Sequence, residues 1–272
     1  MAMKDPHVVS LRYTVKYDPR VKFENPPPLE HETESFTLRL AGETLMVEMK
    51  DHHAAPDSAR ALVEPFLEAW GIDTSLNTGW TPTTFNYQTA KIVDHAPPEP
   101  VVPGVIHAEG AEVGQPGSEA GTFTVSQPVA REYPKPPESF ALDPTVASMF
   151  DRYRGYRAGR EPLFAMAYWC LTCLERAGGG RERASDKYGI DLAILRTLGQ
   201  ITSTAGDPMT ARKVNDPKKV KDSKFANSPL TPQLRTWVDN AVKLLIRRAG
   251  QYAADPAVAK HRLTLKDLPP PT

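Results

Sequence analysis

Apolar and polar residues alternate along several short stretches of the N-terminal half. Residues 8–17 mix β-branched and aromatic side chains with partial alternation, which predicts a strand that ends at Asp18-Pro19. Residues 36–40 and 44–49 alternate on either side of the tripeptide Ala41-Gly42-Glu43. Two alternating runs joined by a short turn predict a β-hairpin.

Two further strand regions and one helix complete the pattern of this half. The strands are predicted within residues 80–93 and 121–132, with a long loop rich in glycine and proline between them. The helix begins near Pro56, with Asp57 as a suitable N-cap, and its apolar side chains recur on one face. Gly71 predicts its end, because glycine is a common helix terminator.

The C-terminal half changes to a spacing of three to four residues, which is typical of amphipathic helices. Asp143 followed by Pro144 marks a helix start, because aspartate caps the first amides and proline fits the first turn. Residues 162–176 and 188–202 predict two more helices, and a long last helix begins after Thr231.

These patterns predict an α+β fold. The N-terminal domain, residues 1–133, is expected to be an antiparallel sheet with one covering helix. A Pro-rich linker, residues 134–141, leads to an all-α helical bundle at residues 142–254, and residues 255–272 form a C-terminal tail.

Charge is distributed unevenly between the halves. Residues 142–272 contain 22 Lys and Arg against 13 Asp and Glu, a net charge of +9, which residues 1–141 balance. A basic half indicates an anionic partner, or an attraction to the acidic half or to a second copy of the chain.

Two basic segments are candidate phosphate contacts. Residues 151–160 interleave arginines with Tyr153 and Tyr156, a combination that suits phosphate contacts and base stacking, although solvated arginines beside buried rings would give the same pattern. Residues 208–224 hold six basic residues against two acidic ones, as either a phosphate-gripping loop or a solvated one. The candidate arginines of the first segment are Arg152, Arg154, Arg157 and Arg160.

Three short patterns resemble chemical sites without completing one. Asp51, His52 and His53, with His31, invite a metal site, but adjacent residues of a strand point to opposite sides. The Cys-x-x-Cys of Cys170 and Cys173 lies within an apolar helix, so buried structural cysteines are expected. The three glycines at 178–180 lack the Lys-Ser/Thr of a phosphate-binding loop. We therefore expect no metal and no cofactor.

The order of helices and loops in the C-terminal half resembles the HEPN superfamily, small helical domains common in prokaryotic defence and toxin systems. The matching stretches are PLFAMAYWCLTCLE, KYGIDLAILRTLGQI, ARKVNDPKK and PQLRTWVDNAVKLLIRRAG. The N-terminal stretches ENPPPLEHE and ARALVEPFLEAWGID resemble the front part of uncharacterised prokaryotic proteins that carry such a tail. The resemblance implies a helical module that dimerises or docks a partner protein.

The chain departs from the family at its catalytic motif. Active HEPN ribonucleases place a histidine a few residues after an arginine, just before the last long helix. Arg212 occupies that loop, but no histidine follows it until His261, beyond the last helix. The resemblance therefore implies phosphate affinity without cleavage. The residues that would carry this affinity are Arg212, Lys213, Asn215, Lys218 and Lys219.

Three functions stay open on the sequence. The first is a non-catalytic protein that binds RNA or another phosphate-bearing ligand, within a defence system. The second is an interaction or assembly module whose helical half forms a homodimer or binds a partner. The third is a ribonuclease with a non-standard set, Arg212 with Asp216 or Tyr188. No stretch approaches the roughly 18 apolar residues of a membrane span, and two cysteines indicate a reducing cytoplasm.

Overall fold

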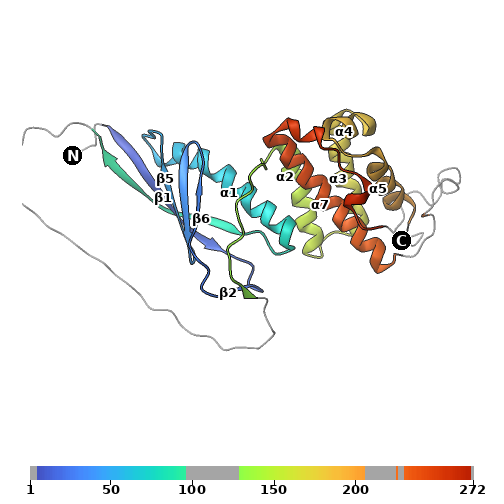
Figure 1. Cartoon of the computed structure of the whole chain (residues 1–272), viewed down its shortest axis with the longest axis horizontal. Helices are drawn as coiled ribbons and strands as arrows, with labels where there is room; N and C mark the ends of the chain where they lie inside the picture. Colours follow the sequence, from blue (N-terminus) through green and yellow to red (C-terminus); the bar gives the residue numbers. More distant parts are fainter. Residues whose placement is uncertain (1–4, 96–128, 206–224, 226–229, 271–272) are drawn as a thin grey trace, which may run out of the picture. The chain divides into compact units, whose positions relative to one another are not determined.

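The chain combines an antiparallel sheet with a set of packed helices, which confirms the predicted α+β fold (Figure 1). The computed structural model describes residues 5–95, 129–205, 225 and 230–270. These residues belong to two compact units. The sheet unit comprises Met1–Val63 and Thr84–Pro134, and the helical unit comprises Glu64–Thr83 and Lys135–Thr272.

The sheet has five antiparallel strands in the order β3-β4-β5-β1-β6. Hydrophobic side chains alternate along the inner strands, so one face is buried, as the pairs Leu11 with Val47 and Tyr13 with Leu45 illustrate. A separate parallel pair joins the short strands β2 and β7. The strands are β1 (Pro6–Lys16), β2 (Lys22–Phe23), β3 (Leu29–Glu32), β4 (Phe36–Ala41), β5 (Thr44–Met49), β6 (Thr84–Asp94) and β7 (Val129–Ala130).

The predicted hairpin is present as β4 and β5, which turn at Gly42 with a positive φ of 61°. The region predicted as one or two strands within residues 80–93 is the single strand β6. Of the strand predicted within residues 121–132, only β7 lies in the described part of the chain.

Helix α1 (Pro56–Thr78) corrects the prediction that the helix ends at Gly71. A Cβ at Gly71 would overlap the backbone carbonyl of Thr83, so this glycine permits a close approach within the helical unit instead of ending the helix. The helix continues to Thr78 and is followed by Gly79, whose φ is +71°. Asp57 is also not an N-cap, because it lies inside the first turn and pairs with Arg60.

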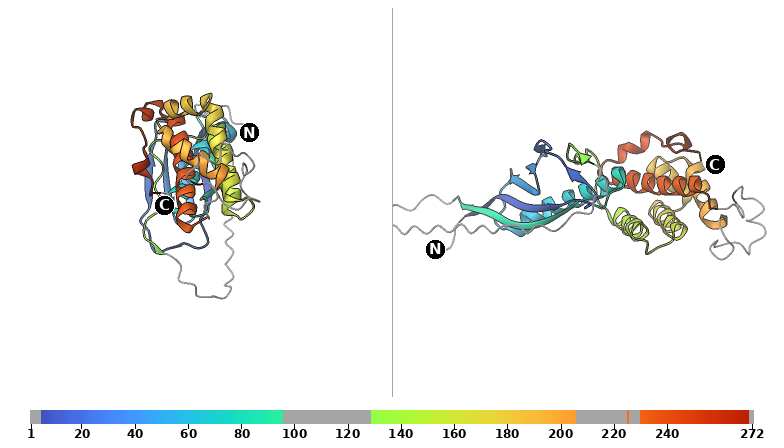
Figure 2. Two further views of the ribbon diagram at one scale, coloured as in Figure 1. Left: turned by 90° about the vertical axis from the view of Figure 1, so that its right-hand side faces the viewer. Right: turned by 90° about the horizontal axis from the view of Figure 1, so that it is seen from below.

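The helical unit is built around α3, which contacts α2, α4, α5 and α7 (Figures 1 and 2). Its helices are α2 (Pro144–Arg157), α3 (Leu163–Gly178), α4 (Arg181–Tyr188), α5 (Leu192–Thr204) and α7 (Pro232–Ala254), followed by the 3-10 turns η1 (Pro256–Lys260) and η2 (Leu265–Asp267). Asp143 caps α2 and Thr231 caps α7, each before a proline, as predicted.

One apolar core fills this unit, and α1 contributes to it. Trp237 and Leu245 of α7, both fully buried, share the core with side chains from the second half of α1. The contributing side chains of α1 are Ala69, Ile72 and Leu76.

The helix predicted for residues 188–202 is α5, which begins four residues later than predicted. Tyr188 ends α4, and Gly189 then takes a left-handed conformation with φ +60°, so α5 begins only at Leu192. Helix α4 was not predicted, because its sequence RERASDKY is too polar to show an apolar stripe. Among the described residues, no helix combines the length and the apolar character that crossing a membrane requires.

Candidate functional site

The arginine run of α2 is largely committed to internal contacts. Arg152 forms an ion pair with Glu161, with 2.5 Å between Nη1 and Oε1, and its guanidinium lies 4.5 Å from the centre of the Trp169 ring. Hydrogen bonding to Glu161 raises the pKa of Arg152. The Arg152 side chain is therefore held by Glu161, with its charge over the indole ring.

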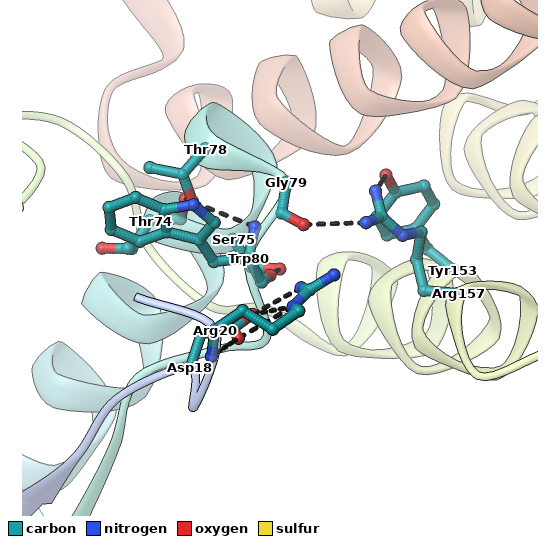
Figure 3. Close-up of polar contacts among 9 residues, drawn as sticks. All are labelled: Asp18, Arg20, Thr74, Ser75, Thr78, Gly79, Trp80, Tyr153 and Arg157. Atoms are coloured by element: carbon teal, nitrogen blue, oxygen red, sulfur yellow. Dashed lines mark hydrogen bonds and ion pairs between the residues drawn. The ribbon is translucent and has the colours of Figure 1, made fainter. Parts of the chain in front are cut away.

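The next two arginines also bond within the helical unit. Arg154 pairs with Asp151, one turn earlier, at 2.7 Å. Arg157 donates from Nη2 to the carbonyl of Gly79 at 2.7 Å and from Nη1 to the Tyr153 hydroxyl at 3.3 Å (Figure 3). Neither is a ready phosphate ligand, because a phosphate would have to displace these bonds.

Arg160 differs from its neighbours. It is exposed, and among the described residues it has no ion-pair partner. The structure therefore leaves one of the four predicted arginines available. The remaining predicted phosphate contacts, Arg212, Lys213, Asn215, Lys218 and Lys219, lie outside the described residues.

The tyrosines of the run do not form a stacking surface. Tyr153 is buried in the core, and Tyr156 is partly buried against it. Burial raises the pKa of both hydroxyls. Of the two interpretations of this run, base stacking or buried rings beside solvated arginines, buried rings describe Tyr153 better.

The carboxylates of the helical unit from Asp143 onward are satisfied internally, whereas Glu68 and Glu138 of the same unit are exposed. Every Asp and Glu that the structure describes between Asp143 and Asp267 has a partner within the unit. Those in ion pairs are Asp151, Glu161, Glu175, Glu182, Asp186 and Asp239. Those that accept backbone amides at helix starts are Asp143, Asp191, Asp255 and Asp267.

Several Arg and Lys side chains of the same unit have no such internal partner. Each is exposed and has no carboxylate partner among the described residues, so the excess positive charge of this unit faces solvent. These side chains are Arg160, Arg176, Arg183, Arg235, Lys260 and Lys266.

A second cluster lies in the sheet unit, where three imidazole rings pack together. The ring centre of His7 is 4.5 Å from that of His95 and 5.1 Å from that of His52. Nε2 of His52 lies 3.2 Å from a carboxylate oxygen of Asp5. Nε2 of His53 and Nδ1 of His7 are buried and have no hydrogen-bond partner among the described residues.

Strand pairing creates this cluster. The antiparallel register of β1 and β6 places Pro6 opposite Asp94, which brings the ends of the two strands together. The backbone amide of Val8 also donates to the carbonyl of His53 at 2.8 Å, which holds the segment after β5 beside them. The sequence offered no local signal for His7 and His95, because they lie far apart along the chain.

The cluster does not reproduce the metal pattern considered from the sequence. His31 lies on β3, at the opposite edge of the sheet from β6. In the described part of the chain, no three His, Cys, Asp or Glu side chains are arranged to hold a metal ion. The rings of His7 and His52 are nearly parallel, 15° apart, and so stack on each other.

Burial within this cluster lowers the pKa of His7 below its ordinary value of 6.5. Burial contributes most, followed by the neighbouring His95, His52 and His53, whereas Asp5 opposes the shift. His7 is therefore held as a neutral ring near neutral pH.

We expect the sheet unit to lose stability as the pH falls through 6.5 toward the lowered pKa of His7. The unfolded chain binds the proton more tightly than the folded chain there, so acid favours unfolding, and above 6.5 the effect is absent. Amide hydrogen exchange in β1 and β6, corrected for intrinsic rates, would measure it at about pH 7.5 and about pH 5.5. His7→Asn should remove the acid sensitivity, and His31→Asn is the matched control. Full retention of the sensitivity in His7→Asn would contradict the assignment.

Two other candidate groups lie in the interior. Cys170 is buried, and burial raises the pKa of its thiol, which agrees with the structural role predicted for it. Tyr188 is buried beside Tyr252, with the ring centres 5.0 Å apart, and burial raises its pKa to about 12. Tyr188 is only 2% exposed, and its partners in the non-standard set, Arg212 and Asp216, lie outside the described residues.

Comparison of the chain with protein-family models, with curated proteins and with solved structures found no match. The HEPN resemblance therefore stays a prediction, and the chemistry of the described residues is the basis for function.

Proposed function

We propose that the helical unit binds nucleic acid through cations that have no internal partner, and that it does not cleave the bound strand. The observation that carries the proposal is the asymmetry between its charges. Each described carboxylate from Asp143 onward is used within the unit, whereas exposed arginines are left over. A phosphate backbone is the polymer that best satisfies such an excess, because each contact releases condensed counterions.

The proposal excludes cleavage on chemical grounds. Metal-free RNA cleavage needs a group that takes the proton of the 2′-hydroxyl, commonly a histidine. The histidine expected after Arg212 is missing from the sequence, and His261 lies after α7, where its carbonyl accepts a hydrogen bond from Arg248. A HEPN-like scaffold that has kept phosphate affinity, in a prokaryotic defence system, is the biological setting that we propose.

Removal of three unpaired cations tests the proposal. In the variant Arg160→Gln, Arg176→Gln, Arg183→Gln, we expect the affinity for a labelled oligouridylate at low salt to fall by at least about tenfold. The slope of log affinity against log salt should become shallower by about 2, because each single-strand phosphate contact contributes about 0.7. Fluorescence anisotropy over a salt series would measure both quantities.

The matched control removes the same number of positive charges from exposed positions of the sheet unit. Lys16→Gln, Lys22→Gln and Lys91→Gln change the net charge equally and should leave affinity within about twofold. Equal losses in both variants would show that only net charge matters. Absence of salt-sensitive binding by the unaltered chain, together with a stable dimer in light scattering, would favour an assembly module instead.

The basic segment outside the described residues provides an independent test. Charge reversal by Lys218→Glu and Lys219→Glu should weaken RNA binding and flatten its salt dependence. Binding that is unchanged in this variant would restrict the contact surface to the helices.

A further inference from the structure

Among the described residues of the helical unit, one large aromatic side chain is exposed beside the cations. Trp169 is 41% exposed, whereas Trp237 of the same unit is fully buried. Trp169 lies on the outward stripe of α3, which runs through Ala165, Thr172 and Arg176. These residues recur at intervals of four, three and four, so they share one face of the helix.

The guanidinium group of Arg152 packs over this indole ring. It lies 4.5 Å from the centre of the Trp169 ring, and its Nη1 donates to Oε1 of Glu161 at 2.5 Å. The arginine side chain remains 42% exposed. Two planar groups, one aromatic and one cationic, are thus held together where solvent reaches both of them.

A phosphate contact is available on the same face. Arg176 lies seven residues after Trp169, which corresponds to about 10 Å along an α-helix. It is exposed and has no carboxylate partner among the described residues. A backbone phosphate held at Arg176 would leave a base a nucleotide or two away, near Trp169.

The two forms of nucleic acid differ in what they can offer this surface. In a duplex the bases stack on one another and present only their edges, so the duplex can use the cations but not the indole. In a single strand the bases are free to stack on aromatic rings and on guanidinium planes. Stacking on Trp169 would therefore add affinity for single strands alone.

We infer that Trp169, packed against Arg152 and followed by Arg176, is a base-stacking site that gives the helical unit a preference for single-stranded nucleic acid. This inference rests on the proposed function. It adds to it a ligand class and a residue, Trp169, that charge considerations alone do not select.

Anisotropy titrations of the full chain with a labelled oligouridylate and a labelled RNA duplex of equal length test the inference. Trp169→Ala should weaken single-strand binding about tenfold and duplex binding by less than about twofold. Trp169→Phe keeps a ring and should recover most of the single-strand affinity. Arg176→Gln should weaken both ligands and reduce the salt slope of the single strand by about 0.7.

The outcomes separate the two ideas. A loss in Trp169→Ala that is equal for both ligands, or no loss at all, overturns the stacking site. If the triple arginine variant still loses affinity in that case, the proposed function stands without this site. Unchanged circular dichroism and melting temperature of Trp169→Ala would show that a selective loss does not come from unfolding.

Discussion

Gly189→Ala is expected to destabilise the helical unit by about 3 kcal/mol. Gly189 has a φ of +60°, which costs a residue with a Cβ about 1–2 kcal/mol. A Cβ there would also overlap the carbonyl oxygen of Ala259 and lie 2.7 Å from its Cα. This neighbour is main chain, so it cannot rotate away as a side chain would. Urea unfolding followed by helical circular dichroism would measure the loss.

A second glycine of the same unit distinguishes the cost of the positive φ from the cost of the steric overlap. Gly159 has a φ of +72°, but no heavy atom lies within 4 Å of a Cβ built there. Gly159→Ala should therefore cost only about 1 kcal/mol, the conformational part. Equal losses in the two variants would mean that the contact with Ala259 contributes nothing.

Arg248→Met is expected to cost about 3 kcal/mol, because it removes two charge-assisted hydrogen bonds from a buried site. Arg248 is only 4% exposed and donates to the carbonyls of Val258 at 2.7 Å and His261 at 2.9 Å. Burial lowers the pKa of this arginine, because removal from water disfavours its charged form. Methionine keeps most of the apolar stem, so the loss reports the hydrogen bonds. Urea unfolding would again measure it.

Arg235→Met is the control on the same helix. Arg235 is exposed and has no ion-pair partner among the described residues, so its loss should lie within about 0.5 kcal/mol of zero. The double variant of Gly189 and Arg248 should be less destabilised than the sum of the single losses. Both changes release the same segment, because Ala259 lies between the two carbonyls that Arg248 holds. Additive losses would show that the two contacts act separately.

The sequence predicted correctly those elements whose turn and cap residues are neighbours along the chain. Alternation on either side of Gly42 predicted the hairpin of β4 and β5, and the caps Asp143 and Thr231 marked two helix starts. The prediction that the helix ends at Gly71 was wrong. A glycine is necessary there because the backbone of Thr83, which follows the helix, comes close to it. A close approach of this kind leaves no trace in the spacing of apolar residues.

The candidate sites depended more on long-range contacts. The arginine run was visible in the sequence, but the pairing of Arg152 with Glu161 and the bond from Arg157 to Gly79 were not. Trp169 was counted within an apolar helix, and only the packing of α3 shows that its ring faces outward. The histidine cluster was hidden for the same reason, since the register of β1 and β6 brings His7 and His95 together.

The sharing of α1 between the two units bears on how the protein is divided for experiments. A fragment that begins at Lys135 contains α2 to α7 but lacks Ala69, Ile72 and Leu76 of the helical core. Such a fragment would expose to water the hydrophobic surface that α1 covers, and it would tend to aggregate. Recombinant work on nucleic-acid binding should therefore use the whole polypeptide, because a fragment that begins at Glu64 would carry β6 without its partner β1.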